Sequence, residues 1–265
     1  MRIGWLSDIH LNFVAPRHRQ AFYDTVRREA PDALLIGGDI GEADSVVRFL
    51  SEIERAFDVP VYFVLGNHDF YGGSIAEVRR LVAAETANSS VLHWLPATGV
   101  VEVTPKTALI GHDSWADGRL GDFFRSGVRL NDYVHIRELT GLTTSELHRK
   151  LNQLGDEAAE FLEARAKEAL DTGRDVLVLT HVPPFREACW HEGQISGNEW
   201  LPHFACRAVG EHLARLMCEY PDRTMTILCG HTHSSGFVQI QDNLAVHTGG
   251  AEYGTPKLQK VLDLC

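Results

Sequence analysis

Cysteine is scarce in this 265-residue chain, which has only Cys189, Cys206, Cys218, Cys229 and Cys265. Their number is odd, they are scattered, and no pair has the close spacing of a thiolate metal site. This pattern favours free thiols and a reducing compartment. We therefore expect neither a disulfide framework nor a structural zinc site built on thiolates.

Long apolar runs and an excess of positive charge are also absent. No stretch is long and apolar enough to cross a membrane. The formal net charge of −11 argues against a broad basic surface for duplex nucleic acid. It is compatible with a phosphate substrate, because bound divalent ions would dominate the local field. The chain leads straight into an apparent strand, with no cleavable leader, so we expect a cytoplasmic protein.

Repeats, low-complexity tracts and convincing linkers are missing as well. A chain of this length with 44% hydrophobic residues can bury a large core as one α/β domain over residues 1–265. Length alone does not exclude two small domains.

Five short apolar runs end in a polar cluster that contains Asp, Asn or His, and each run has the composition of a buried strand. In open α/β sheets, ligands bind at the carboxyl ends of the strands. The five clusters therefore indicate one shared site. They are Asp8-Ile9-His10 after Arg2 to Ser7, Gly37-Gly38-Asp39 after Ala33 to Ile36, Gly66-Asn67-His68-Asp69 after Val61 to Leu65, His181 after Val176 to Thr180, and Gly230-His231-Thr232-His233 after Thr224 to Cys229.

The donor atoms in these clusters are carboxylate, imidazole and amide oxygen. This set suits borderline-hard divalent ions such as Mn, Fe or Zn, whose preferences overlap too far to choose among them. There are too many ligands for one tetrahedral ion. Two ions roughly 3.5–4 Å apart are typical of sites that catalyse in-line displacement at phosphorus.

The five clusters together resemble the ordered signature of the calcineurin-like metallophosphoesterases, from Asp8 to His233. Each block alone is weak, but the ordered set is specific. The resemblance implies an α/β fold, a four-layer α/β/β/α sandwich of two mixed sheets with flanking helices.

The resemblance also implies a role for each matching residue. Asp8, His10 and His233 would hold the first metal and Asn67, His181 and His231 the second, with Asp39 bridging both. A hydroxide between the metals would be the nucleophile. His68 would protonate the leaving oxygen or bind a phosphate oxygen, and we expect Glu42 to orient His68.

A structural interpretation competes with this one at single positions. A lone histidine at a strand end is more often a hydrogen-bonded structural residue. Taken jointly, the seven proposed ligands leave little room for that interpretation. For Asp69 we prefer the structural interpretation, and we expect this residue to stabilise its own turn or to cap the helix that begins near Ser74.

Helical and strand patterns alternate in the first third of the chain, which predicts parallel pairing there. Helices are expected over residues 16–30, 44–57 and 74–85, and then a long one over 143–171 with a capping box from Thr143 to Glu146. Apolar runs follow one another directly at 91–95, 100–103 and 107–110. Residues 236–248 predict a hairpin turning at Asp242-Asn243.

Two further segments are expected to select the substrate. Residues 111–139 are long for a connection and rich in Arg and aromatics, which favours a cap. Residues 183–202 follow His181 and form a substrate-side loop. Alternatively, the aromatics pack on the sandwich and the arginines are solvated, and the two interpretations are evenly balanced. His191 is expected to be hydrogen-bonded or at the surface. The candidate substrate contacts are His112, Trp115, Arg125, Arg129, Trp190 and Trp200.

The sequence thus predicts a dinuclear metal-dependent phosphoesterase, either a phosphodiesterase or a phosphomonoesterase, for a small or nucleotide-like substrate. A nuclease acting on single strands or ends is the alternative, and would need a basic groove. A non-catalytic scaffold on the same fold is a third hypothesis, disfavoured because every ligand position is filled. The oligomeric state is left open.

Overall fold

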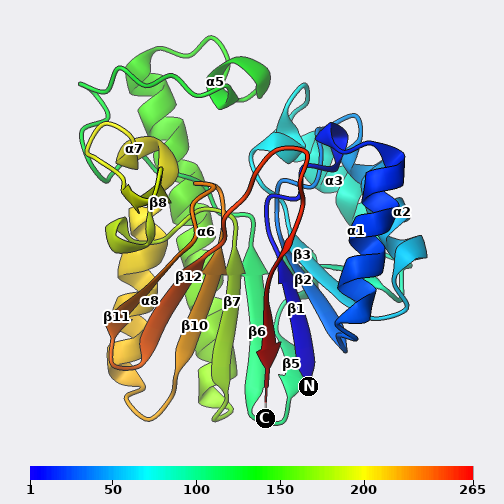
Figure 1. The fold of residues 1–265 in the computed structure, drawn as a ribbon. Helices are drawn as coiled ribbons and strands as arrows, with labels where there is room; N and C mark the ends of the chain where they lie inside the picture. Colours follow the sequence, from blue (N-terminus) through cyan, green and yellow to red (C-terminus); the bar gives the residue numbers. More distant parts are fainter. Residues whose placement is uncertain (265) are drawn as a thin grey trace.

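Two β-sheets packed face to face form the centre of the molecule, and helices cover their outer faces (Figure 1). The computed structural model describes residues 1–264, so Cys265 lies outside the described residues. The arrangement confirms the expected four-layer α/β/β/α sandwich. Cys189, Cys206, Cys218 and Cys229 are free thiols, as expected. Among residues 1–264, no helix has the length and apolarity needed to span a membrane.

The first sheet has the strand order β13-β1-β2-β3-β4. Neighbours from β1 to β4 pair in parallel, as predicted for the first third of the chain. The C-terminal strand β13, which no sequence pattern indicated, pairs antiparallel to β1. The strands are β1 Arg2–Leu6, β2 Ala33–Gly37, β3 Val61–Val64, β4 Leu92–Trp94 and β13 Leu258–Asp263.

The second sheet has the order β11-β12-β10-β7-β6-β5, parallel in its centre and antiparallel at both edges. The predicted hairpin over Asp242-Asn243 is confirmed as β11 and β12. The chain leaves the first sheet after β4 and enters the second through the short helix α4, Leu95–Thr98. The strands are β5 Val101–Thr104, β6 Thr107–His112, β7 Asp175–Thr180, β10 Met225–Cys229, β11 Gly236–Gln241 and β12 Leu244–Thr248.

Four of the long helices lie where the sequence predicts them. Helices α1 (Pro16–Arg28), α2 (Val46–Ala56) and α3 (Ile75–Thr86) cover the first sheet, and α6 (Thr144–Asp171) and α8 (Arg207–Glu219) the second. Of these helices, α8 was not predicted. The capping box at the start of α6 is confirmed, since Thr143 and Glu146 each accept from the other's backbone N–H. The shorter elements are η1 Leu11–Phe13, η2 His68–Phe70, α5 Asp132–His135, η3 Arg186–Ala188, β8 Trp190–His191, β9 Gln194–Ile195 and α7 Leu201–Phe204.

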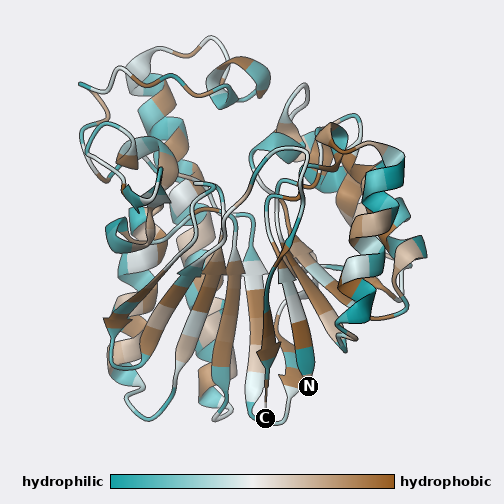
Figure 2. Cartoon of the chain, viewed as in Figure 1, coloured by the Kyte–Doolittle hydropathy of each residue, from teal (hydrophilic) through white to brown (hydrophobic). Residues whose placement is uncertain are grey.

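The central strands are apolar on both faces because each face has a partner layer. In β2, Leu34 and Ile36 face the helices of their own side, whereas Ala33 and Leu35 face the opposite sheet. Figure 2 shows the resulting apolar colouring of the central strands. This double burial holds the two sheets in a fixed relation to each other.

The packing brings the carboxyl ends of β1, β2, β3, β7 and β10 to one end of the sandwich. The loops that follow these strands carry all the polar clusters singled out in the sequence. The short helices α5 and α7, from the two segments expected to select substrate, lie beyond the same end (Figure 1).

Candidate metal centre

The loops after the strands hold their polar residues in a strained backbone conformation. Eight non-glycine residues among 1–264 have positive φ, a region that costs energy for residues with a Cβ. Five of them lie in these loops, and such strain persists only where the surroundings enforce it and clusters at functional sites. They are Asp8 (52°), His10 (40°), Asp39 (53°), His231 (70°) and His233 (59°).

Two glycines let the loops approach one another closely. A Cβ on Gly66 would lie 2.1 Å from Oδ1 of Asp39, and one on Gly230 would lie 2.0 Å from Oδ2 of Asp8. Both distances are far below contact, so a larger residue at either position would displace a carboxylate. The glycines next to the polar clusters are therefore part of the site's geometry.

Asp69 ties two of the loops together. Its fully buried carboxylate accepts from the backbone N–H groups of Ile40 (2.9 Å), Gly41 (2.8 Å) and Gly66 (2.9 Å). The expectation that it settles its own turn is confirmed by the Gly66 contact. It does not cap helix α3, because Ser74 accepts from Glu77 N–H there.

A first cluster consists of Asp8, His10, Asp39 and His233, whose potential ligand atoms all lie within 4.8 Å of one another. The Nε2 atoms of His10 and His233 are 3.2 Å apart. Burial, followed by the neighbouring histidines, lowers the pKa of His10 to about 2. Burial also lowers the pKa of His233, and the neutral imidazole that both shifts favour is the form that binds metals.

A second cluster consists of Asn67, His181 and His231. His181 directs Nδ1 at the carbonyl of Gly37 (2.8 Å), and His231 directs Nε2 at the carbonyl of His203 (3.2 Å). Because a carbonyl only accepts, each ring carries a hydrogen on that nitrogen, and in a neutral imidazole, the form that binds metals, the other nitrogen keeps a lone pair. Those nitrogens lie 2.9 and 3.0 Å from Oδ1 of Asn67. With both rings neutral, three acceptors converge with no hydrogen between them.

Asp39 lies between the two clusters. Its Oδ2 is 3.6 Å from Nε2 of His10, and its Oδ1 is 3.4 Å from Nε2 of His181. The same Oδ1 accepts from the backbone N–H of His68 at 2.9 Å. Burial first, then the charges of Asp8 and Asp69, raise the pKa of Asp39 well above its usual value. A nearby cation would stabilise its ionised form.

The buried aspartates separate into two groups by their partners. Away from the site, Asp113 and Asp117 are each paired with an arginine, at 3.0 and 3.2 Å. Within residues 1–264, the four buried aspartates at the site form no ion pair with Lys or Arg. Buried carboxylates without a cation are costly, so two divalent ions fit both the charge and the donor set. These four are Asp8, Asp39, Asp69 and Asp132.

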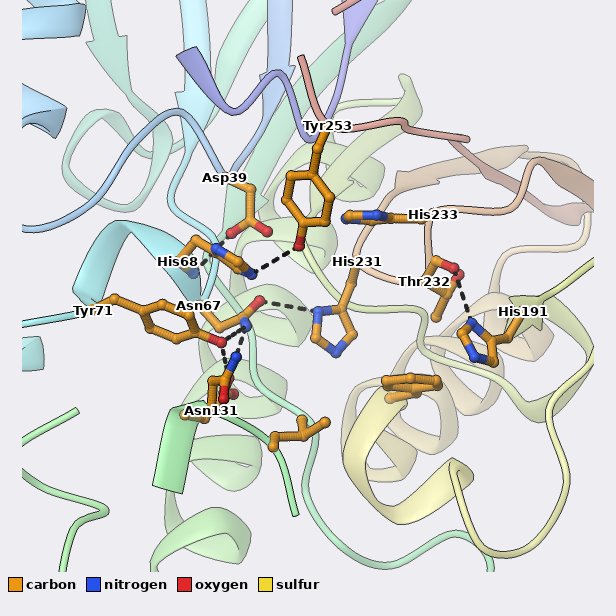
Figure 3. Close-up of a pocket in the computed structure, with 13 residues that line it drawn as sticks. Asp39, Asn67, His68, Tyr71, Asn131, His191, His231, Thr232, His233 and Tyr253 are labelled. Atoms are coloured by element: carbon orange, nitrogen blue, oxygen red, sulfur yellow. Dashed lines mark hydrogen bonds between the residues drawn. The ribbon is translucent and has the colours of Figure 1, made fainter. Parts of the chain in front are cut away.

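A cavity of about 230 Å³ opens over both clusters (Figure 3). His68 lies on its wall, where its ring stacks on Tyr71 at 4.3 Å between centroids. Its Nε2 is 3.5 Å from the hydroxyl of Tyr253. Burial, then the neighbouring His181 and His233, lowers the pKa of His68 to about 4.

Glu42 does not orient His68, contrary to the sequence-based expectation. Its carboxylate accepts from Nδ2 of Asn12 at 3.2 Å. Nδ1 of His68 has no hydrogen-bond partner among residues 1–264, and Nε2 faces Tyr253. The ring of His68 is held by stacking on Tyr71 and not by a carboxylate.

Several residues of the cavity wall were not singled out in the sequence. Tyr71 and Asp132 reach Asn67, and Tyr253 lies against His10 with 4.6 Å between ring centroids. Tyr253 comes from the stretch before β13, which carries no motif. Asp132 belongs to the segment expected to be a cap, in which only Arg, His and aromatic residues were predicted to contact the substrate. The other wall residues missed are Leu130, Asn131, Phe204 and Thr232.

Three of the six expected substrate contacts pack within the fold. His112 is buried, accepts from Ser114 N–H at 3.0 Å, and packs on Phe161. Trp115 packs on Phe70 and borders only an inner void of about 10 Å³. Trp190 lies against Gly236, where a Cβ would be 2.1 Å from its Nε1. For these residues the packing interpretation holds.

The other three expected contacts are solvent-accessible. The side chain of Arg125 is 88% exposed and pairs with Asp122. Arg129 and Trp200 border a second cavity of about 450 Å³, which shares Leu130 and Asn131 with the first. His191, expected to be hydrogen-bonded or at the surface, lines the first cavity and contacts the carbonyl of Thr232 at 3.4 Å.

Comparison with known proteins adds evidence of three kinds. A sequence model of the calcineurin-like phosphoesterases matches residues 1–235. UDP-2,3-diacylglucosamine hydrolases from Xanthomonas campestris and Stenotrophomonas maltophilia are each 31% identical over 121 residues, which is 41% of this chain and 44% of the relative. The match thus spans less than half the length of these curated relatives.

Solved structures resemble the chain over nearly its whole length. A phosphopantetheinyl hydrolase from Mycobacterium tuberculosis has a TM-score of 0.66 at 16% identity, covering 95% of this chain and 89% of that one. A dimetal phosphatase from Danio rerio has a TM-score of 0.59 at 14% identity, covering 97% and 89%. At such identities the likeness establishes the fold alone.

Proposed function

The chain belongs to the calcineurin-like phosphoesterase family, and on that premise we propose that it hydrolyses small phosphate esters with two bound divalent metal ions. One observation carries the proposal: two clusters of acceptor atoms converge beneath a cavity and are joined by Asp39. Asp8 and Asp39, which are buried in the first cluster without a Lys or Arg partner among residues 1–264, support it, because a bound cation would stabilise their ionised forms.

The first ion would be held by Asp8, His10 and His233, the second by Asn67, His181 and His231, and Asp39 would contact both. Carboxylate, imidazole and amide donors suit Mn, Fe or Zn. When bound, such ions supply a nucleophile at neutral pH and stabilise charge on phosphoryl oxygens.

His68 would pass a proton to the leaving oxygen: burial lowers the pKa of its imidazole, and the negative charge of a bound phosphate would raise that pKa again. Support comes from its place on the cavity wall and from Nε2, which lies 3.5 Å from the hydroxyl of Tyr253. Tyr71 holds the ring by stacking, and Asp39 holds the backbone by accepting from His68 N–H at 2.9 Å. Tyr253 is placed to donate a hydrogen bond to a phosphate oxygen beside His68.

The arginines of the segment 111–139 favour a small substrate over a long polyanion. Arg119, Arg125 and Arg137 each pair with carboxylates. Within the described chain, Arg129 forms no ion pair, and it borders the second cavity together with Trp200. A guanidinium beside an exposed indole suits a substrate with a ring and a second anionic group. The name of the curated relatives, UDP-2,3-diacylglucosamine hydrolase, agrees with that chemistry.

Replacement of Arg129 tests this placement of the substrate. Arg129→Ala should raise KM about 10-fold and leave kcat nearly unchanged, because it removes binding that ground and transition states share. Arg125→Ala is the matched control, since Arg125 is exposed in the same segment but borders neither cavity. Steady-state kinetics on a nucleotide-like ester would measure both. Equal KM values for the two variants would refute the role of Arg129.

The function itself is tested with simple esters. We would load the purified protein with Mn²⁺ and compare hydrolysis of p-nitrophenyl phosphate with that of bis-p-nitrophenyl phosphate, with Asp39→Asn as the control. Activity that the variant lacks supports the proposal, and the preferred ester distinguishes a phosphomonoesterase from a phosphodiesterase. A protein that binds two ions yet shows no such activity on esters, including nucleotides, would be a non-catalytic scaffold.

A further inference from the structure

Asp132 is a buried carboxylate with no Lys or Arg partner in the described part of the chain, and the proposed reaction gives it no role. It is 3% exposed and lies at the start of α5, within the segment 111–139. Its Oδ1 accepts from Nδ2 of Asn67 at 2.8 Å and from the hydroxyl of Tyr71 at 2.6 Å. Both partners of the carboxylate belong to one group, because the hydroxyl of Tyr71 also contacts the amide of Asn67.

The amide of Asn67 has two chemically different sides. Nδ2 faces acceptors, namely the Asp132 carboxylate and, at 3.1 Å, the hydroxyl oxygen of Tyr71. Oδ1 faces the ring nitrogens of His181 and His231 (Figure 3 shows the contact with His231). A carboxylate only accepts, so it selects the orientation in which the NH₂ group points toward it. The oxygen is thereby directed to the second cluster.

The position of Asp132 is itself well anchored. Helix α5 and the residues after it are tied to the loop before α3 by backbone contacts, Gly72 N to His135 O at 2.9 Å and Arg137 N to Gly73 O at 3.0 Å. Glu138 accepts from Ser74 Oγ at 2.7 Å and from Ile75 N–H at 2.9 Å. The segment that carries Asp132 is therefore fixed to the same loop that carries Asn67.

The two clusters differ in how their members are held. All three members of the second cluster have outer partners: Asp132 and Tyr71 for Asn67, the Gly37 carbonyl for His181, and the His203 carbonyl for His231. In the first cluster, Asp8 has such partners in the hydroxyl of Ser7 and the backbone N–H of His231, whereas Nδ1 of His10 is buried with no hydrogen-bond partner among residues 1–264. Outer partners that orient ligands increase metal affinity.

We propose that Asp132 is a positioning residue, which holds the oxygen of Asn67 toward the second metal and so makes that site the tighter of the two. The proposal rests on the proposed role of Asn67 as a metal ligand. It gives the segment 111–139 a part in the metal centre, beyond its place beside the substrate cavities.

Calorimetric titration of the metal-free protein with Mn²⁺ tests this. The wild type should bind two ions with unequal affinities. Asp132→Leu should weaken the tighter site about 10- to 100-fold, the usual effect of removing an outer partner. Asp132→Asn keeps one acceptor and should have an intermediate effect. Val134→Ala, at an exposed position of the same helix, should leave both affinities unchanged.

A double variant separates positioning from a merely structural role. Asn67→Ala should itself weaken the tighter site, and Asp132→Leu should then add no further loss, because Asp132 acts only through Asn67. Thermal unfolding of each metal-free variant checks that it folds. If Asp132→Leu does not fold, Tyr71→Phe removes the other partner of the amide and should weaken the same site to a smaller extent.

Several results would overturn the proposal. These are wild-type affinity in Asp132→Leu, additive losses in the double variant, equal affinities at the two sites, or fewer than two ions in the wild type. Failure of the proposed function is a separate result. If the wild type and variants bind Mn²⁺ as expected but no phosphate ester is cleaved, Asp132 keeps its role while the hydrolase assignment fails.

Discussion

Asp39→Asn is expected to abolish phosphoesterase activity and to weaken both metals at once. The two oxygens of Asp39 face different clusters, one near His10 and the other near His181. The substitution replaces one oxygen with an NH₂ group, which presents hydrogens where a lone pair is needed, and removes the negative charge. We expect kcat/KM to fall by more than about 10³-fold, beyond the roughly 10²- to 10³-fold loss that follows removal of a single stabilising donor.

Metal content and stability give independent measures of this change. Mn²⁺ should raise the unfolding temperature of the wild type, because an ion that binds only the folded state stabilises it by about 2.7 kcal/mol at a concentration of 100 Kd. For Asp39→Asn that increase should largely disappear, while the metal-free variant stays folded. Asp122→Asn, an exposed carboxylate near Arg125, is the control. Full activity with two bound ions in Asp39→Asn would refute the shared-ligand assignment.

The sequence predicted the layers of this fold well because burial on both faces leaves a simple pattern. Strands such as Val61–Val64 are short apolar runs, and each ends at a Gly or polar cluster that marks the carboxyl edge of the sheet. The strand β13 has no such pattern. Its positions are half-buried or exposed without a period of two, and it lies at a sheet edge, where its pairing with β1 depends on the completed first sheet.

The site was predictable to the extent that its residues sit at strand ends. The structure brings all seven proposed ligands together. Asp132 and Tyr253 were missed because their contacts depend on where the chain returns in space. Tyr71, four residues after Asn67, was missed although its contact is local. The predicted role of Glu42 was wrong because the spacing of Glu42 from Asp39 does not determine where its side chain points. The carboxylate of Glu42 accepts a hydrogen bond from Asn12 instead.

The aromatic residues of segment 111–139 show the limit of composition as evidence. Trp115 and Phe123 are buried against the sandwich, so they anchor the segment and do not face a substrate. The residues that reach the cavity, Leu130, Asn131 and Asp132, are neither basic nor aromatic. Arg and aromatic content identified the segment, whereas the positions that face the site followed from the packing of α5.

His68→Ala is expected to keep both metals and slow the reaction by about 10²- to 10⁴-fold, the usual contribution of a positioned proton donor. The metals should remain because Asp39 accepts from the backbone N–H of His68, which alanine retains. The loss should depend on the leaving group. An alkoxide needs a proton as the ester bond breaks, whereas p-nitrophenolate leaves readily without one.

The experiment therefore compares an alkyl and a p-nitrophenyl ester of the same type in the wild type and in His68→Ala, with metal content measured in parallel. We expect the variant to lose far more activity on the alkyl ester. His135→Ala is a matched control, since this exposed histidine packs on Tyr71, the same tyrosine on which His68 stacks, but does not line the cavity. Equal losses on both esters would show that His68 binds the phosphate instead, because a phosphate contact serves every leaving group alike.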